Sequence, residues 1–163
     1  MAKNKEEKTN VMRVLEQKKI AYTAHTYPHE EGVAVDGVTV AKSMGFDPAI
    51  VFKTLVARGA SKQYYVFDVP VAENLDLKKA AKAVGEKSIE MLHQKELLPL
   101  TGYVHGGCSP VGMKKLFPTV FHETAENLET MIVSAGKIGY QVELSPRDLA
   151  SLVRAKFADI IVE

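Results

Sequence analysis

Apolar residues alternate with polar ones over several short stretches of the chain, and this alternation predicts β-strands. Residues 51–57 and 63–70 are strongly apolar and close together, which predicts two strands joined by a hairpin over residues 59–62. Residues 20–27 predict an earlier strand that places His25 and Tyr27 on one face. Three further strands are predicted over residues 119–123, 131–135 and 140–144.

Apolar residues at helical spacing, preceded by capping residues, predict helices between these strands. Asn10 is expected to cap a first helix, and Asp76 a second one that ends at Gly85. Ser145 followed by Pro146 predicts the start of a third helix, which extends toward residue 157. Shorter helical turns are predicted within residues 38–45, directly after Asp47, and within 125–129.

The order of these elements favours an α+β fold. Most pairs of consecutive strands lack the regular intervening helix that a doubly wound parallel sheet requires. We therefore expect a curled, mixed but mostly antiparallel sheet with flanking helices. Neither an internal repeat nor a low-complexity linker divides the sequence, so we expect a single domain over residues 1–163.

Composition restricts the partners and the compartment. The 21 Lys and Arg residues nearly balance the 20 Asp and Glu residues, so RNA contacts would have to use local patches rather than an overall positive field. A lone cysteine, Cys108, excludes an internal disulfide. Since the lone cysteine gives no sign of an oxidising compartment, we expect a cytoplasmic protein. Because no apolar segment is long enough to cross a bilayer, we expect it to be soluble and to make no membrane contact.

Lys53 is the most informative single residue in the pattern. It lies within a predicted strand that is apolar on both faces. A buried ammonium needs an anionic or hydrogen-bonding partner, or it loses its proton, which is a typical feature of a functional group. The alternative is a lysine near a strand end whose aliphatic stem is buried while its ammonium reaches water.

The glycine-rich segment 102–115 resembles a phosphate-binding loop only superficially. Gly107 and Gly112 have the required separation, but Met113 precedes the lysine and Pro110 removes a backbone donor. Two uses remain open. The loop could be a tight turn, or its backbone N–H groups could bind a carbonyl oxygen or an oxyanion.

Cys108 in this loop is a candidate nucleophile, with His105 as the nearest candidate base. The alternative is a small, partly buried cysteine without a catalytic role. His105 and Cys108 could also begin a metal site, but the sequence has no second cysteine and no H-E-x-x-H motif. We therefore expect neither a metal nor another cofactor.

Four segments together resemble the YbaK family of aminoacyl-tRNA deacylases, which is related to the editing domain of bacterial prolyl-tRNA synthetase. They are VFKTL, GYVHGGCSPVG, VSAGK and LASLVRAKFADI, in that order. The resemblance extends from the first helix to the last strand and is closest to free-standing Cys-tRNA(Pro) deacylases. It implies a mixed sheet with flanking helices and hydrolysis of the ester that joins a wrong amino acid to tRNA.

The resemblance also implies site residues. Lys53 matches the functional lysine of the family, and Gly106 and Gly107 match the loop in which a backbone amide contacts the aminoacyl carbonyl. The implied substrate-binding residues are Tyr27, Ser109, Pro110 and Ser134. Two positions depart from the family. Asp36 stands near the usual place of an aromatic residue, and Gln141 stands in place of an aspartate.

The mechanism that the resemblance implies is substrate-assisted. The thiol of the mischarged cysteine, rather than a protein side chain, attacks the ester carbonyl, and the protein contributes positioning and carbonyl polarisation. The implied partners are the aminoacyl end of tRNA and prolyl-tRNA synthetase. The departures leave open a preference for Ala-tRNA(Pro) or another small amino acid, and a non-catalytic module that binds tRNA or synthetase.

Overall fold

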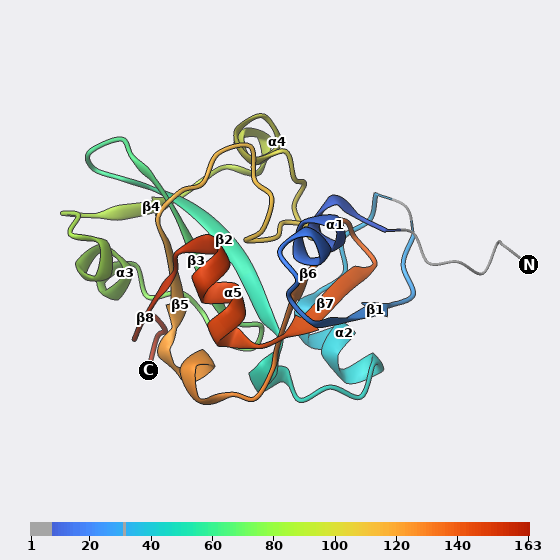
Figure 1. The fold of residues 1–163 in the computed structure, drawn as a ribbon. Helices are drawn as coiled ribbons and strands as arrows, with labels where there is room; N and C mark the ends of the chain where they lie inside the picture. Colours follow the sequence, from blue (N-terminus) through green and yellow to red (C-terminus); the bar gives the residue numbers. More distant parts are fainter. Residues whose placement is uncertain (1–7, 31) are drawn as a thin grey trace, which may run out of the picture.

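A computed structural model describes residues 8–30 and 32–163 of the chain. Its strands form two sheets, of three and five strands (Figure 1). The expected α+β class is confirmed, and four of the six strand pairs are antiparallel. The expected single curled sheet is instead divided in two, with an isolated bridge between Val51 and Ile132 linking the parts. The expected domain over residues 1–163 includes residues outside the described ones and stays a prediction.

The smaller sheet is fully antiparallel and has the strand order β1-β7-β6. Its strands are β1 (Tyr22–Thr26), β6 (Met131–Ser134) and β7 (Tyr140–Leu144). Helix α1 (Asn10–Gln17) and helix α5 (Pro146–Val153) contribute to the same hydrophobic core as this sheet, with Leu15 and Leu149 fully buried. This core fixes the position of β7, from which Gln141 extends.

The larger sheet is mixed and has the order β4-β2-β3-β5-β8. The antiparallel hairpin of β2 (Phe52–Gly59) and β3 (Tyr64–Pro70) confirms the predicted pair of strands. Strands β5 (Thr119–His122) and β8 (Lys156–Ala158) extend the sheet in parallel, while β4 (Ile89–Met91) pairs with the other edge of β2. Only residues 57–59 of β2 pair with β4, so the first half of that edge is left for other contacts.

Within residues 8–30 and 32–163, three further helices and two short 3₁₀ segments complete the fold. Helix α2 (Gly37–Ser43) packs near the 3₁₀ segment η2 (Pro48–Ile50), α3 (Leu77–Val84) covers the larger sheet, and η3 (Glu123–Asn127) follows β5. Helix α4 (Gln94–Thr101) lies beside the glycine loop, at the top of the view in Figure 1. Sequence reasoning missed α4, because Pro99 within it is unfavourable in a helix interior.

The helix ends follow the capping chemistry that the sequence predicted, with two differences. The third predicted helix, expected to extend toward residue 157, ends at Val153, because Arg154 adopts the left-handed conformation and residues 156–158 form strand β8. Asp76 caps α3 by accepting from the Lys78 and Lys79 amides, and Gly85 ends it with a positive φ. For α1 the predicted cap was wrong, because Thr9 is the capping residue and accepts from the Met12 amide, while Asn10 is already helical. Both residue types cap well, so the sequence alone did not distinguish neighbouring positions.

Candidate functional site

A cavity of about 540 Å³ lies at the unpaired part of the β2 edge. Residues 51–55 form one wall, residues 34–37 and 105–108 contribute loops, and the smaller sheet contributes the ends of its strands. The volume is within the range of small-molecule sites. Four of the predicted site residues, from four segments distant in sequence, line it: Tyr27, Lys53, Gly106 and Ser134.

Lys53 is half-buried in this cavity. Burial lowers the pKa of its ammonium, while the carboxylates of Asp36 and Glu73 oppose that change. Among the described residues Lys53 makes no ion pair within 4 Å. The charges of these two carboxylates thus favour the ammonium form of Lys53 in a cavity partly removed from water. Because no ion pair among the described residues uses its N–H groups, they can donate to an anionic ligand.

Asp36 is exposed, lines the cavity and caps α2. Its carboxylate accepts hydrogen bonds from the amide and the hydroxyl of Thr39, at 3.1 and 3.2 Å. Its carboxylate acts on Lys53 through charge and at the same time fixes the start of α2.

Four polar residues from the smaller sheet and its strand ends line the cavity: Tyr27, Ser134, Tyr140 and Gln141. Tyr27 is 6 % exposed, and its backbone amide donates to the carbonyl of Gly139. Ser134, at the end of β6, accepts from the amide of Gly136 through its hydroxyl. Gln141 is 8 % exposed, and within residues 8–30 and 32–163 its Oε1 has no hydrogen-bond partner. The cavity thus contains a neutral acceptor at the position where the sequence departs from the family.

The two adjacent glycines of the loop differ in their environment. Gly106 is exposed, lines the cavity and has φ +89, and a Cβ there would lie 2.6 Å from Cβ of Ala34. Gly107 does not line the cavity, its amide donates to the Val104 carbonyl, and a Cβ there would lie 3.0 Å from the backbone nitrogen of Ile138. At Gly106 a side chain would be strained by the positive φ and would meet Ala34 at the edge of the cavity, whereas Gly107 packs closely against the turn at residues 137–138.

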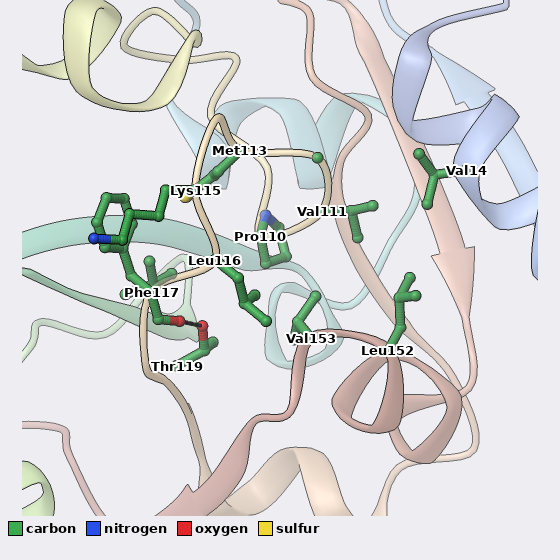
Figure 2. A pocket seen from close by; sticks show the side chains of 12 residues that line it. Val14, Pro110, Val111, Met113, Lys115, Leu116, Phe117, Thr119, Leu152 and Val153 are labelled. Atoms are coloured by element: carbon green, nitrogen blue, oxygen red, sulfur yellow. Dashed lines mark hydrogen bonds between the residues drawn. The ribbon is translucent and has the colours of Figure 1, made fainter.

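Ser109 and Pro110 belong to the same glycine-rich segment but do not line the cavity. Ser109 is fully buried and its hydroxyl accepts from the amide of Val111. Figure 2 shows Pro110 beside a smaller, mostly apolar hollow of about 130 Å³, together with Leu116 and Val153. Their expected substrate contacts stay predictions, and in this structure both residues shape the turn.

Cys108 lines the cavity but is 7 % exposed. Burial, and secondarily the charge of Asp68, raise the pKa of its thiol to about 12. A thiol with that pKa stays protonated at neutral pH, and the protonated form is a poor nucleophile. The environment therefore favours the interpretation in which Cys108 is not the catalyst.

The part of the chain that the structure describes contains no cluster of three His, Cys, Asp or Glu side chains that could hold a metal ion. None of its helices is long and apolar enough to cross a membrane.

Two polar residues at the site were missed by sequence reasoning. Thr54 lines the cavity, and its hydroxyl donates to Oδ1 of Asp68 at 2.5 Å. Asp68 itself is fully buried. A signal was present, since an aspartate interrupts the otherwise apolar strand 64–70, but its partner is 14 positions away and becomes its neighbour only through the hairpin.

Solved structures define the class of fold to which this arrangement belongs. A candidate trans-editing enzyme for prolyl-tRNA synthetase superposes with a TM-score of 0.80 at 24% identity, over 97% of this chain and 100% of that one. The hypothetical protein APE2540 superposes with a TM-score of 0.83 at 19% identity, over 94% of this chain and 100% of that one. At these identities the likeness shows the fold.

Sequence comparison gives the family. The model of the aminoacyl-tRNA editing domain matches residues 32–152. An Enterococcus faecalis protein, EbsC, named as a candidate Cys-tRNA(Pro)/Cys-tRNA(Cys) deacylase, is 47% identical over 161 residues, which are 98% of each chain. The chain belongs to the aminoacyl-tRNA editing domain family, and editing makes aminoacyl-tRNA its substrate class. The resemblance inferred from the four motifs is confirmed.

Proposed function

We propose that the protein is a trans-editing deacylase that hydrolyses the ester of Cys-tRNA(Pro). The observation that carries the proposal is the meeting of Lys53, Tyr27, Gly106 and Ser134 at one cavity, from four distant segments. The 47% identity to a candidate Cys-tRNA(Pro)/Cys-tRNA(Cys) deacylase supports the choice of the aminoacyl group. Translation supplies this substrate in the cytoplasm, where we expect the protein to act.

The proposed reaction uses the nucleophile of the substrate. The cysteinyl sulfur bonds to the ester carbonyl carbon, the bond from that carbon to the ribose oxygen breaks, and the thiol proton ends on the ribose hydroxyl. Water then opens the cyclic thioester to give free cysteine. Cys108 does not replace this thiol, because burial keeps its own thiol protonated.

The protein contributes charge and geometry to this reaction. The Lys53 ammonium, in a cavity partly removed from water, stabilises negative charge that develops on the carbonyl oxygen or is carried by the adjacent phosphate. Gly106 lets the loop backbone turn and pack against Ala34 at the cavity, where we expect that backbone to face the aminoacyl ester. The thiol and the carbonyl belong to the same aminoacyl group, so the attack is intramolecular, and the cavity contributes by holding the rotamer that places the thiol against the carbonyl.

The test is release of labelled cysteine from Cys-tRNA(Pro), beside Ala-, Ser- and Pro-charged tRNA(Pro). We expect hydrolysis of Cys-tRNA(Pro) well above the uncatalysed rate and no attack on Pro-tRNA(Pro). Preferential hydrolysis of Ala-tRNA(Pro) would transfer the assignment to that substrate. No hydrolysis of any of the four at micromolar protein would refute a deacylase.

We also propose that prolyl-tRNA synthetase assists the encounter with tRNA. The near-neutral net charge of +1 supports a need for assistance, because strong autonomous RNA binding depends on many cationic contacts. Adding the synthetase should raise kcat/KM for Cys-tRNA(Pro) at physiological salt. An unchanged kcat/KM, with tight tRNA binding by the deacylase alone, would contradict this part of the proposal.

A further inference from the structure

Asp68 is an acidic side chain in the middle of the larger sheet. It lies on β3 between β2 and β5, pairs with Thr54 and Phe121, and is 0 % exposed. Oδ1 accepts one hydrogen bond, from Thr54, while in the described ranges 8–30 and 32–163 Oδ2 has no partner. Burying a carboxyl group with half of its acceptors unpaired costs stability, so its presence requires another physical explanation.

The carboxyl group lies directly behind one wall of the cavity. Thr54 pairs with Asp68 and Val56 pairs with Val66, so these four side chains share one face of the hairpin. Cys108 packs on this face with Val56 and Val66. Thr54 and Cys108 both line the cavity, whereas Asp68 does not. Thr54 therefore connects the buried carboxyl group to the space that holds the ligand.

The hydrogen bond determines what Thr54 can offer to a ligand. A threonine hydroxyl has one hydrogen atom and two lone pairs. Because the hydrogen atom is directed to Asp68 at 2.5 Å, only lone pairs remain for other contacts. That separation matches the short bonds that hydroxyl groups make to carboxylates. Without Asp68 the hydroxyl could rotate and could equally well donate.

We propose that Asp68 is a positioning residue that holds the Thr54 hydroxyl as a hydrogen-bond acceptor for the aminoacyl group in the cavity. The inference rests on the proposed deacylase function. The amino acid carries two groups that can donate, the α-ammonium and a side-chain thiol or hydroxyl. The shared chemistry is an N–H, S–H or O–H donor that Thr54 helps to orient relative to the ester carbonyl.

A double-mutant cycle on Cys-tRNA(Pro) tests the coupling. We expect Thr54→Val and Asp68→Val each to lower kcat by about tenfold, a typical cost of lost orientation, with little change in KM. The double variant should be no slower than the slower single variant, because Thr54→Val removes the hydroxyl and Asp68→Val removes the orientation of that same hydroxyl. If the two losses of kcat instead multiply to about a hundredfold in the double variant, the two effects are independent and the proposal is overturned.

Conservative variants separate positioning from packing. Thr54→Ser keeps the hydroxyl, and Asp68→Asn keeps a carbonyl oxygen opposite Thr54, so both should retain most of the wild-type kcat. Asp68→Val should unfold at the wild-type temperature or above, since it removes an unpaired buried group. Should Asp68→Val not fold, Thr54→Val compared with Thr54→Ser still decides, because equal kcat values for those two variants would refute the role of the hydroxyl.

Two outcomes identify the donor, and both support the proposal. A loss in Thr54→Val on Cys-tRNA(Pro) that disappears on 3-mercaptopropionyl-tRNA(Pro), which keeps the thiol but lacks the α-ammonium, assigns the contact to the α-ammonium. An equal loss on both substrates, measured in single turnovers with excess enzyme, assigns it to the side chain. Inactive wild-type protein would refute the deacylase itself, whereas active wild-type protein with an equally active Asp68→Val variant would refute only the positioning role.

Discussion

Lys53 and Asp68 are ionisable residues on neighbouring strands, but they lie in different environments. Lys53 is half-buried at the cavity, and the charges of Asp36 and Glu73 oppose the effect of burial on its pKa. Asp68 is fully buried on the opposite face of the hairpin, and one hydroxyl group is its hydrogen-bond partner. Burial raises the pKa of Asp68 to about 7, against the partial opposition of Thr54.

Both side chains are unfavourable to bury, but they contribute to the cavity in different ways. The Lys53 ammonium can contact a ligand directly, because it lines the cavity. Asp68 can act only through Thr54, because it has no exposed surface. We therefore expect removal of Lys53 to lower kcat/KM strongly. Removal of the Asp68 charge should be seen mainly in how the free energy of unfolding depends on pH.

The largest expected effect is that of Lys53→Ala. Removing the cation should lower kcat/KM on Cys-tRNA(Pro) by about a hundredfold, the usual range for loss of one electrostatic stabiliser. The unfolding temperature should hardly change, because burial already disfavours the ammonium. Lys87→Ala, which removes an exposed lysine, is the matched control and should be fully active. An active Lys53→Ala variant would contradict the assignment.

A smaller loss is expected for the loop opposite β2. Gly106→Ala forces a side chain into φ +89 and against Ala34, and should reduce kcat/KM by roughly tenfold through a displaced loop. Gly45→Ala is the control for backbone strain alone, with φ +76 and no atom within 4 Å of the new Cβ. Both variants should lose about 1 kcal/mol of stability. Equal activity in the two would mean that Gly106 acts only as a turn residue.

The pH dependence of the free energy of unfolding tests how burial changes the titration of Asp68. The folded-state pKa of about 7 lies above the ordinary value of 3.8, so the folded protein binds this proton more tightly than the unfolded chain does. The free energy of unfolding should therefore fall as pH rises from about 4 to about 7, by on the order of a few kcal/mol, and then level off.

Asp68→Asn cannot undergo this titration, so the test is the difference in free energy of unfolding between Asp68→Asn and wild type. That difference should grow from pH 5 to pH 7.5 in favour of the variant. Urea unfolding at four or five pH values measures it. A constant difference would mean that Asp68 titrates near its ordinary pKa in the folded protein.

The smallest expected effect is that of Cys108→Ala. Because the thiol stays protonated and the substrate supplies the nucleophile, the variant should keep kcat within about twofold of wild type. Replacing the cysteine of the substrate by serine should instead slow wild-type turnover sharply. Equal rates on Cys- and Ser-charged tRNA, with an inactive Cys108→Ala variant, would make Cys108 the catalyst.

The sequence by itself determined the features that depend on neighbouring residues. Alternation predicted the β2–β3 hairpin, and capping residues predicted the ends of α3 and the start of α5, because these signals act within a few positions. Motifs in order along the chain identified the family, and Lys53 stood out because a cation interrupts an apolar strand. The same local rules did not predict helix α4, because Pro99 is unfavourable in a helix interior.

Only the tertiary structure decided which groups meet. Gly106 and Gly107 are neighbours with the same side chain, yet Gly106 lines the cavity and packs against Ala34, whereas Gly107 packs against the turn at residues 137–138 and does not line the cavity. Asp68 reaches Thr54 through strand register, and Gln141 joins the cavity through sheet order. Burial and charge at such positions depend on contacts between residues far apart in the chain, which no local pattern of one sequence specifies.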